Sequence, residues 1–165
     1  MKKIGICGVP SDAGAAHLGG RMGPDALRVA GIREALVRRG YQVQDYGNCQ
    51  ISEGEHSAED PSARNLSLVT AWNKSLFQKT LETLESGAIP LTLGGDHAFA
   101  VGSIGAAATH CARHNLQLKV LWFDAHADFN SPETSPSGNI HGMPVKVLTG
   151  HGPKPLLDLL EPQGF

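Results

Sequence analysis

The chain has 165 residues, which is enough for one domain with a hydrophobic core but too few for two. Its 41% hydrophobic and 18% charged residues are those of an ordinary globular protein. Fourteen basic and sixteen acidic side chains give a net charge of -2, and because no run of five or six basic residues occurs, neither a nucleic acid nor a membrane surface is expected as a partner.

The amino terminus opens with two lysines and an apolar stretch that ends at Asp12, too soon for the core of a signal peptide. No apolar run approaches the roughly 20 residues that a membrane span requires. The three cysteines, Cys7, Cys49 and Cys111, form no C-x-x-C pair, and we predict buried or free thiols in a reducing compartment. These features together predict a cytoplasmic protein.

The first third of the chain predicts a strand, a helix and a second strand. The apolar run over 3–9 is typical of a buried strand, and a glycine-rich loop follows it. A helix is expected over 24–40, because Pro24 suits a first helical position and Gly40 suits a stop. Residues 41–47 predict the second strand.

The same alternation continues to the end of the chain. In order, we expect a polar loop over 48–62, a long helix over 63–86, a strand over 88–93, a helix over 97–114, a strand over 116–123, a loop to about residue 142 and a short helical segment. Strands that alternate with helices indicate a single α/β domain over 1–165 with a parallel sheet. In such sheets, functional sites form beyond the carboxyl ends of the strands.

Asp124, His126 and Asp128 follow the last predicted strand at every second position. In an extended chain, side chains two residues apart point the same way and lie about 6.6 Å apart. Asp124 and Asp128 would then be roughly 13 Å apart, too far for one ion. Either the loop curls, or the group serves two ions, as in hydrolytic sites whose metals lie about 3.5–4 Å apart and share a carboxylate.

The surrounding sequence favours a cation at these carboxylates. No Lys or Arg occurs between Val120 and Val145, so the acids have no basic partner nearby in the chain. Carboxylate and imidazole ligands without a thiolate favour Mn, Fe or Zn over a soft metal. Taken alone, the motif is also compatible with an exposed polar loop.

A second predicted strand ends in the same way, in the stretch LTLGGDHAFA. Gly94 and Gly95 permit a tight turn after the strand. Asp96 is expected to cap the following helix or to support a ligand rather than to be one. His97 would lie at the same sheet edge as Asp124, so two strand ends that carry histidine make metal coordination the better hypothesis.

These motifs resemble those of the ureohydrolases and, within them, the arginases. The resemblance is carried by GGDHAFAVGSI, WFDAHADFNSPETSPSGNIHGMP, GVPSDAGAAHLGGRMGPDALRVAGI and VQDYGN, and it weakens after about Val147. It implies an arginase-type three-layer α/β fold around a parallel sheet. It also implies the hydrolysis of L-arginine to L-ornithine and urea, as in arginine metabolism and the urea cycle, by a protein that assembles into trimers or hexamers.

The resemblance also implies roles for individual residues at a pair of Mn2+ ions. His97 would hold one ion, His126 the other, and Asp124 would bridge them, with Asp128 completing the ligands available here. Three residues match those that bind the α-carboxylate of arginine: Asn130, Ser137 and Asn139. His141 matches a histidine that moves a proton, which suits an imidazole that titrates near neutral pH.

Simpler interpretations stay open for several of these residues. The segment from Ser137 to Asn139 is also typical of a plain turn, and His141 alone would more often be an ordinary surface histidine. Five further histidines match no motif and are predicted to be structural: His17, His56, His110, His114 and His151. Glycine-rich nucleotide-binding motifs and a G-x-S-x-G nucleophile motif do not occur in the sequence.

The chain departs from the arginase pattern in one respect. Arginases complete the metal site with an Asp-x-Asp pair from a later strand, and none of the eight aspartates here has that spacing. The two carboxylates available would face the four positive charges of two divalent ions. Later strands of the family also lie between the strands expected over 88–93 and 116–123, so we expect a truncated or split domain with a gap in its sheet.

Two alternatives therefore stand beside arginase activity. The first is a catalytically incomplete fragment that retains weak metal binding or a partner surface, with little or no activity from the 165 residues alone. The second is a sister ureohydrolase, similar to agmatinase, that acts on another guanidino compound.

Overall fold

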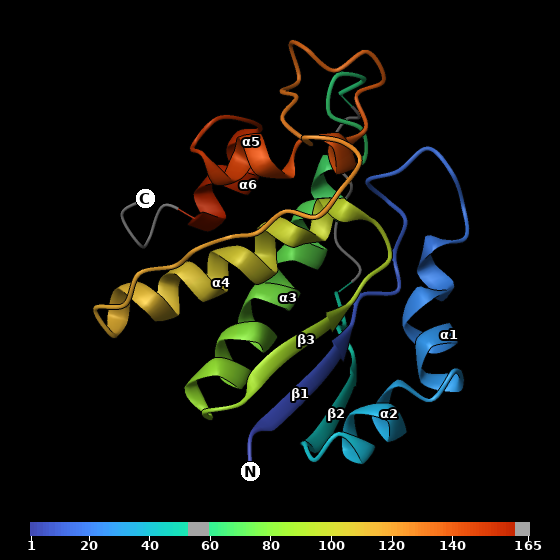
Figure 1. Cartoon of the computed structure of the whole chain (residues 1–165). Helices are drawn as coiled ribbons and strands as arrows, with labels where there is room; N and C mark the ends of the chain where they lie inside the picture. The colour runs from blue at the N-terminus through green and yellow to red at the C-terminus, as the bar shows by residue number, and fades with distance from the viewer. Residues whose placement is uncertain (53–59, 161–165) are drawn as a thin grey trace.

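A computed structural model describes the chain over residues 1–52 and 60–160. Strands and helices alternate along it, and its strands form one parallel sheet (Figure 1). The predicted α/β class is thereby confirmed. None of the described helices is long and apolar enough to cross a membrane. His56 lies outside the described residues.

The sheet has three strands in the order β2-β1-β3: β1 (Lys3–Gly8), β2 (Gln42–Asn48) and β3 (Ile89–Leu93). Both neighbours run parallel to β1, whose Ile4 is paired with Val43 on one side and with Ile89 on the other. After its first residue β1 is buried throughout, which explains why its sequence is apolar without alternation. All three strands lie within a residue or two of the predicted ranges.

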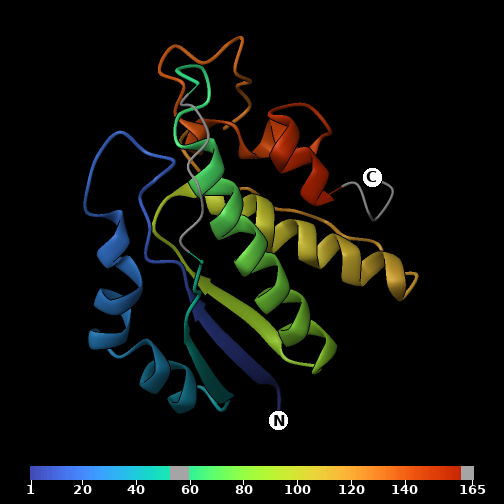
Figure 2. The ribbon, with the colours of Figure 1, turned by 180° about the vertical axis from the view of Figure 1, so that it is seen from behind.

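Helices cover both faces of this sheet and make three layers, as predicted. Figures 1 and 2 show α1 and α2 on one side of the sheet and α3 and α4 on the other. The helices are α1 (Gly23–Val29), α2 (Ile32–Arg38), α3 (Leu66–Glu85), α4 (Ala100–Arg113), α5 (Pro144–Leu148) and α6 (Lys154–Leu160), with short 3-10 turns η1 (Gly20–Met22), η2 (His97–Phe99) and η3 (Ile140–Gly142).

The prediction of a single helix over 24–40 is wrong in one respect, because the segment forms two helices. Gly31 separates α1 from α2 and has a φ of 81°, in the left-handed region that glycine adopts without a Cβ clash. The chain turns there, so that α2 covers Ile4 and Ile6 of the sheet through Ile32 and Leu36.

The strand predicted over 116–123 is absent from the described structure. A strand needs a neighbour to receive its backbone hydrogen bonds, and β3 forms the last described edge of the sheet. The segment instead runs back beside α4 (Figures 1 and 2). Its apolar side chains are therefore left in solvent, with Leu121 77% and Phe123 90% exposed. This arrangement agrees with the expected gap between the third and fourth predicted strands.

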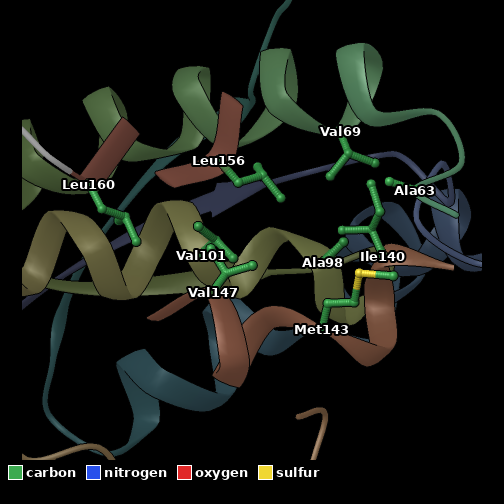
Figure 3. Close-up of a cluster of buried hydrophobic side chains, with 9 residues drawn as sticks. All are labelled: Ala63, Val69, Ala98, Val101, Ile140, Met143, Val147, Leu156 and Leu160. Atoms are coloured by element: carbon green, nitrogen blue, oxygen red, sulfur yellow. The ribbon is translucent and has the colours of Figure 1, made fainter. Parts of the chain in front are cut away.

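The largest buried apolar cluster lies between α3, α4 and the carboxyl-terminal helices (Figure 3). Its members are Ala63, Val69, Ala98, Val101, Ile140, Met143, Val147, Leu156 and Leu160. Ile140 and Met143 are fully buried in it beside Ala98. Burial of these side chains fixes η3 next to η2, which brings residues 139–142 close to His97.

A buried amide ties α3 to the start of α4. Asn73 donates from Nδ2 to the carbonyls of Val69 and Ala98 and accepts at Oδ1 from the amide of Gly102. A Cβ at Gly102 would lie 2.4 Å from the Asn73 carbonyl oxygen, so only glycine allows the two helices to come this close. The small residue at position 102 thus permits close packing of α4 against α3.

The three cysteines are free thiols, as predicted. Two of them nevertheless meet, because β1 and the end of β2 are neighbours in the sheet. Cys7 Sγ lies 3.2 Å from Cys49 Sγ, although 42 positions separate them, and both side chains are buried. The hydrogen bond between the two thiols and their burial raise the pKa of Cys7.

Candidate metal-binding site

Three of the predicted metal ligands meet beyond the carboxyl end of β3. His97 Nδ1 lies 2.9 Å from Asp124 Oδ2 and 2.9 Å from Asp128 Oδ2. One ligand atom from each of the three residues lies within 4.8 Å of the other two, close enough for one ion to contact them all. The two carboxylates are therefore not spread along an extended chain.

The loop curls because Asp124 caps its own turn. Asp124 Oδ1 accepts a hydrogen bond of 2.8 Å from the amide of His126, and Asp128 adopts a left-handed φ of 46°. The amide of Val145 then binds the carbonyl of Asp128, and the amide of Asn130 binds the carbonyl of Gly142. These bonds hold the loop against η3, so the loop curls, which was one of the two predicted alternatives.

Asp96 fixes the backbone of the turn that carries His97. It is the N-cap of η2, accepting at Oδ1 from the amide of Ala98 and at Oδ2 from the amide of Gly14. Burial raises the pKa of Asp96, and these two amides oppose that rise. The supporting role predicted for this residue agrees with its contacts.

Gly95 is required for a reason other than the predicted tight turn. Its φ is not in the left-handed region. A Cβ at Gly95 would instead lie 1.7 Å from the carbonyl oxygen of Ser11, so the backbone itself fills the space. The segments 11–14 and 94–96 approach each other closely here, and the amide of Gly14 binds Asp96 beside this approach.

The charges of the cluster favour a cation. Asp124 and Asp128 have side chains that are only 15% and 10% exposed, and within the described residues they form ion pairs with histidines. The hydrogen bond from the amide of His126 is the main cause that lowers the pKa of Asp124, so this carboxyl group is ionised at neutral pH. His97 stands between the two acids, half exposed, with the Trp122 ring 5.2 Å away.

His126 lies outside the group of three. Its side chain is 83% exposed, and its Nδ1 lies 3.3 Å from Asp124 Oδ1 rather than beside Asp128. A ligand role for His126 stays a prediction.

A cavity of about 750 Å³ opens over the cluster. The predicted metal ligands and the residues matched to substrate binding and proton transfer all line it, namely His97, Asp124, His126, Asp128, Asn130, Ser137, Asn139 and His141. The amide of His141 binds the carbonyl of Gly14, which fixes that residue at the wall. The segment from Ser137 to Asn139 bends at Ser137, and Ser137 and Asn139 line the cavity.

Five further lining residues had no role assigned from the sequence: Ala127, Phe129, Ser135, Pro136 and Gly142. Their position beside residues with an assigned role was the only signal that could have found them.

The residues present fit a divalent cation. Two carboxylates and an imidazole form a hard, mixed oxygen and nitrogen donor set of the kind that Mn, Fe or Zn accepts. The two acidic charges balance one divalent ion. A second ion at the same place would need further acidic ligands.

The comparisons with known proteins agree with this geometry. A model of the arginase family matches residues 2–158. An arginase from Bacillus caldovelox is 44% identical over 154 residues, which are 92% of this chain and 50% of that protein. An arginase from Bacillus subtilis strain 168 is 44% identical over 158 residues, which are 96% of this chain and 52% of that protein. This chain thus spans about half the length of the curated relatives it matches.

Solved structures give the same result. The native arginase of Bacillus caldovelox superposes with a TM-score of 0.87 at 42% identity, covering 97% of this chain and 53% of the other. The arginase of Entamoeba histolytica in complex with L-ornithine superposes with a TM-score of 0.84 at 30% identity, covering 98% and 55%. With the family model matching nearly all of its length, the chain belongs to the arginase family.

Proposed function

We propose that this chain carries one half of an arginase-type active site, at which L-arginine and water give L-ornithine and urea. The observation that supports it most is the convergence of His97, Asp124 and Asp128 on the cavity that Asn130 and His141 also line. Family membership supports hydrolase chemistry of this class.

We infer that His97, Asp124 and Asp128 hold a divalent cation, which the family resemblance suggests is Mn2+. His126, whose Nδ1 lies 3.3 Å from Asp124 Oδ1, would hold a second ion. Such ions supply a water molecule whose pKa is lowered towards neutrality.

The opposite part of the cavity suits the amino-acid end of the substrate. Asn130, Ser137 and Asn139 can donate hydrogen bonds from amide and hydroxyl groups to a carboxylate. These donors are neutral, so they orient the α-carboxylate by geometry rather than by charge. The guanidinium carbon is thereby directed towards Asp124 and Asp128.

His141, which lines the cavity, would move a proton to the departing amine. Attack of water on the guanidinium carbon gives a tetrahedral centre, and cleavage of its bond to the ornithine nitrogen requires that nitrogen to gain a proton. An imidazole titrates close to neutral pH and can give up this proton and recover it from water.

The described ligand set is incomplete for two ions. Arginases use a later Asp-x-Asp pair as well, and two carboxylates do not balance four positive charges. We therefore expect the 165-residue chain alone to release little or no urea, and to need the rest of the site from a segment that carries those acids.

Urea release from L-arginine with Mn2+ tests the proposal. We would assay the chain alone and the same chain joined to the carboxyl-terminal half of the Bacillus caldovelox arginase. That arginase is chosen because this chain is 44% identical to it over 154 residues. The joined protein should release urea, and its Asp128→Asn variant should not. A joined protein that folds and binds Mn2+ but releases no urea would contradict the proposed function, and brisk turnover by the chain alone would overturn the incomplete site.

A comparison of agmatine with arginine as substrates distinguishes arginase activity from that of the sister ureohydrolase. It has the guanidinium group of arginine but no α-carboxylate, so it cannot use Asn130, Ser137 and Asn139. Arginine should be the better substrate of the joined protein, and replacing Asn130 by Ala should reduce this preference. A preference for agmatine would favour the sister ureohydrolase.

A further inference from the structure

A second group of metal-binding side chains lies at the other end of α3 and α4. Glu85 is the last residue of α3, and its two carboxylate oxygens face two histidines of α4. His110 Nδ1 lies 3.2 Å from Glu85 Oε1, and His114 Nε2 lies 3.3 Å from Glu85 Oε2. The sequence predicted only a structural role for these two histidines, and it did not predict that both contact Glu85.

The helix presents the two histidines as a pair. Residues four positions apart lie on one face of an α-helix, and the ring centroids of His110 and His114 are 4.4 Å apart. The ligands of a tetrahedral ion with bonds of about 2.0–2.1 Å lie about 3.3 Å from one another. The contacts between Glu85 and each ring already have this spacing, and one ligand atom of each residue lies within 4.8 Å of the others.

Both helices end at this place, which favours a positive ion. Glu85 closes α3 and His114 is the C-cap of α4, so the partial negative charges of two helix carboxyl termini add to the carboxylate. Hydrogen bonds from His110 and then His114 lower the pKa of Glu85, so the carboxylate is ionised. Arg113 Nη1 is 3.8 Å from Glu85 Oε1 and competes for the same charge.

We propose that Glu85, His110 and His114 bind one divalent cation of the zinc class and so fasten the end of α3 to the end of α4. Two imidazoles and one carboxylate suit Zn2+, Ni2+ or Cu2+ better than Mg2+ or Ca2+, which prefer oxygen ligands alone. The site is separate from the cavity, because α4 has 14 residues and its length of about 20 Å stands between His97 and His114. The proposal does not depend on the proposed arginase chemistry.

Metal titration of the full 165-residue chain tests it. The titration is followed by calorimetry, with Zn2+ as the only added metal, in a His97→Ala background that removes the one imidazole of the cavity cluster. This chain should bind one equivalent of Zn2+. Adding His110→Ala and His114→Ala should weaken binding by at least about 10-fold, the lower end of the losses seen when a metal ligand's support is removed.

A matched control removes a histidine elsewhere. His17 is exposed and lies in the loop before η1, so His17→Ala in the same background should bind Zn2+ like its parent. Absence of Zn2+ binding in the His97→Ala chain would overturn the proposal, and so would equal binding with and without His110 and His114. Circular dichroism at each step confirms that the variants are folded.

Two further measurements report on the geometry. Co2+ in place of Zn2+ should give the visible bands of a tetrahedral ion with nitrogen ligands, and these bands should vanish in the variant without His110 and His114. Arg113→Gln removes the competing charge, so it should tighten Zn2+ binding several-fold. Weaker binding in Arg113→Gln would contradict the assigned carboxylate.

Discussion

His97 and Asp128 are 31 positions apart in the chain, yet His97 Nδ1 lies 2.9 Å from Asp128 Oδ2. The contact joins the turn after β3 to the loop that follows residue 123. Two segments with separate hydrogen-bond supports therefore share one cluster, with Asp96 fixing the first and Val145 and Gly142 fixing the second. A ligand from each segment must be present for the cluster to bind metal.

Asp128→Asn should weaken Mn2+ binding by at least about 10-fold while leaving the fold unchanged. The amide has the size of the carboxylate but lacks its charge, and the carboxylate is nearly buried beside His97. Free Mn2+, measured by electron paramagnetic resonance during titration, reports the affinity. Asp158→Asn is the control, because Asp158 is an exposed acid paired with Lys154 on α6. Unchanged affinity in Asp128→Asn would remove Asp128 from the ligand set.

Asp12→Asn should lower stability at neutral pH by about 1 to 2 kcal/mol. Asp12 is buried, and its hydrogen bond with Arg21, the main cause, lowers its pKa to about 2. Because the folded pKa lies below the unfolded value of about 4, this stabilisation is complete above pH 4 and is lost as the pH falls towards 2. Arg21 is 59% exposed, so solvent screens part of the pair.

Urea denaturation at pH 7 and near pH 2.5 measures this effect. The stability difference between wild type and Asp12→Asn should shrink at the lower pH. Asp25→Asn is the control, because the Asp25 side chain is 71% exposed and pairs with Arg28 at 3.3 Å, so its removal should cost little at either pH. A difference that stays constant with pH would show that the charge of Asp12 does not stabilise the fold.

The sequence predicted those parts of the fold whose cause lies within a few residues of each other. The apolar run of β1 and the long periodic helix α3 were both expected close to their observed bounds. The rule that sites form at strand ends located His97 after β3, and Asp124 lies beside His97 although segment 116–123 forms no strand in the described structure. The break at Gly31 was harder to predict, because a glycine inside a helical pattern does not reveal whether the helix continues or ends there.

What the sequence could not predict depends on distant partners. The apolar segment 116–123 has the composition of a strand, but whether it forms one depends on a neighbouring strand beyond β3. The contact of Glu85 with His110 links the ends of two helices, and neither helix pattern contains it. The curl that brings Asp124 to Asp128 arises from a hydrogen bond between Asp124 and the backbone, which spacing alone leaves open.

Gly138→Ala should destabilise the protein by at least about 2 kcal/mol more than Gly150→Ala. Both glycines have a left-handed φ, of 67° and 84°, so both replacements carry the same backbone strain of about 1–2 kcal/mol. A Cβ at Gly138 would also lie 1.9 Å from the carbonyl oxygen of Pro61, whereas the space around Gly150 is open. Chemical denaturation measures both. Equal losses would mean that the loop around Pro61 moves aside freely.

Asn73→Leu should cost about 2–4 kcal/mol, because it leaves three buried backbone groups without their partner. These groups are the carbonyls of Val69 and Ala98 and the amide of Gly102. Gln78→Leu, an exposed amide on the same helix, is the matched control and should change stability little. If the two variants are equally stable in thermal unfolding, the amide does not hold α4 to α3.

Thr109→Val should leave stability unchanged or raise it by about 1 kcal/mol. Thr109 is fully buried in α4, and within the described chain its hydroxyl has no hydrogen-bond partner, so valine keeps the shape and removes an unpaired polar group. Thr83→Val is the matched comparison, because Thr83 is equally buried but its hydroxyl donates to the carbonyl of Lys79 at 2.8 Å. Denaturation midpoints should therefore fall for Thr83→Val and not for Thr109→Val. The reverse order would show that the Thr109 hydroxyl is satisfied in solution.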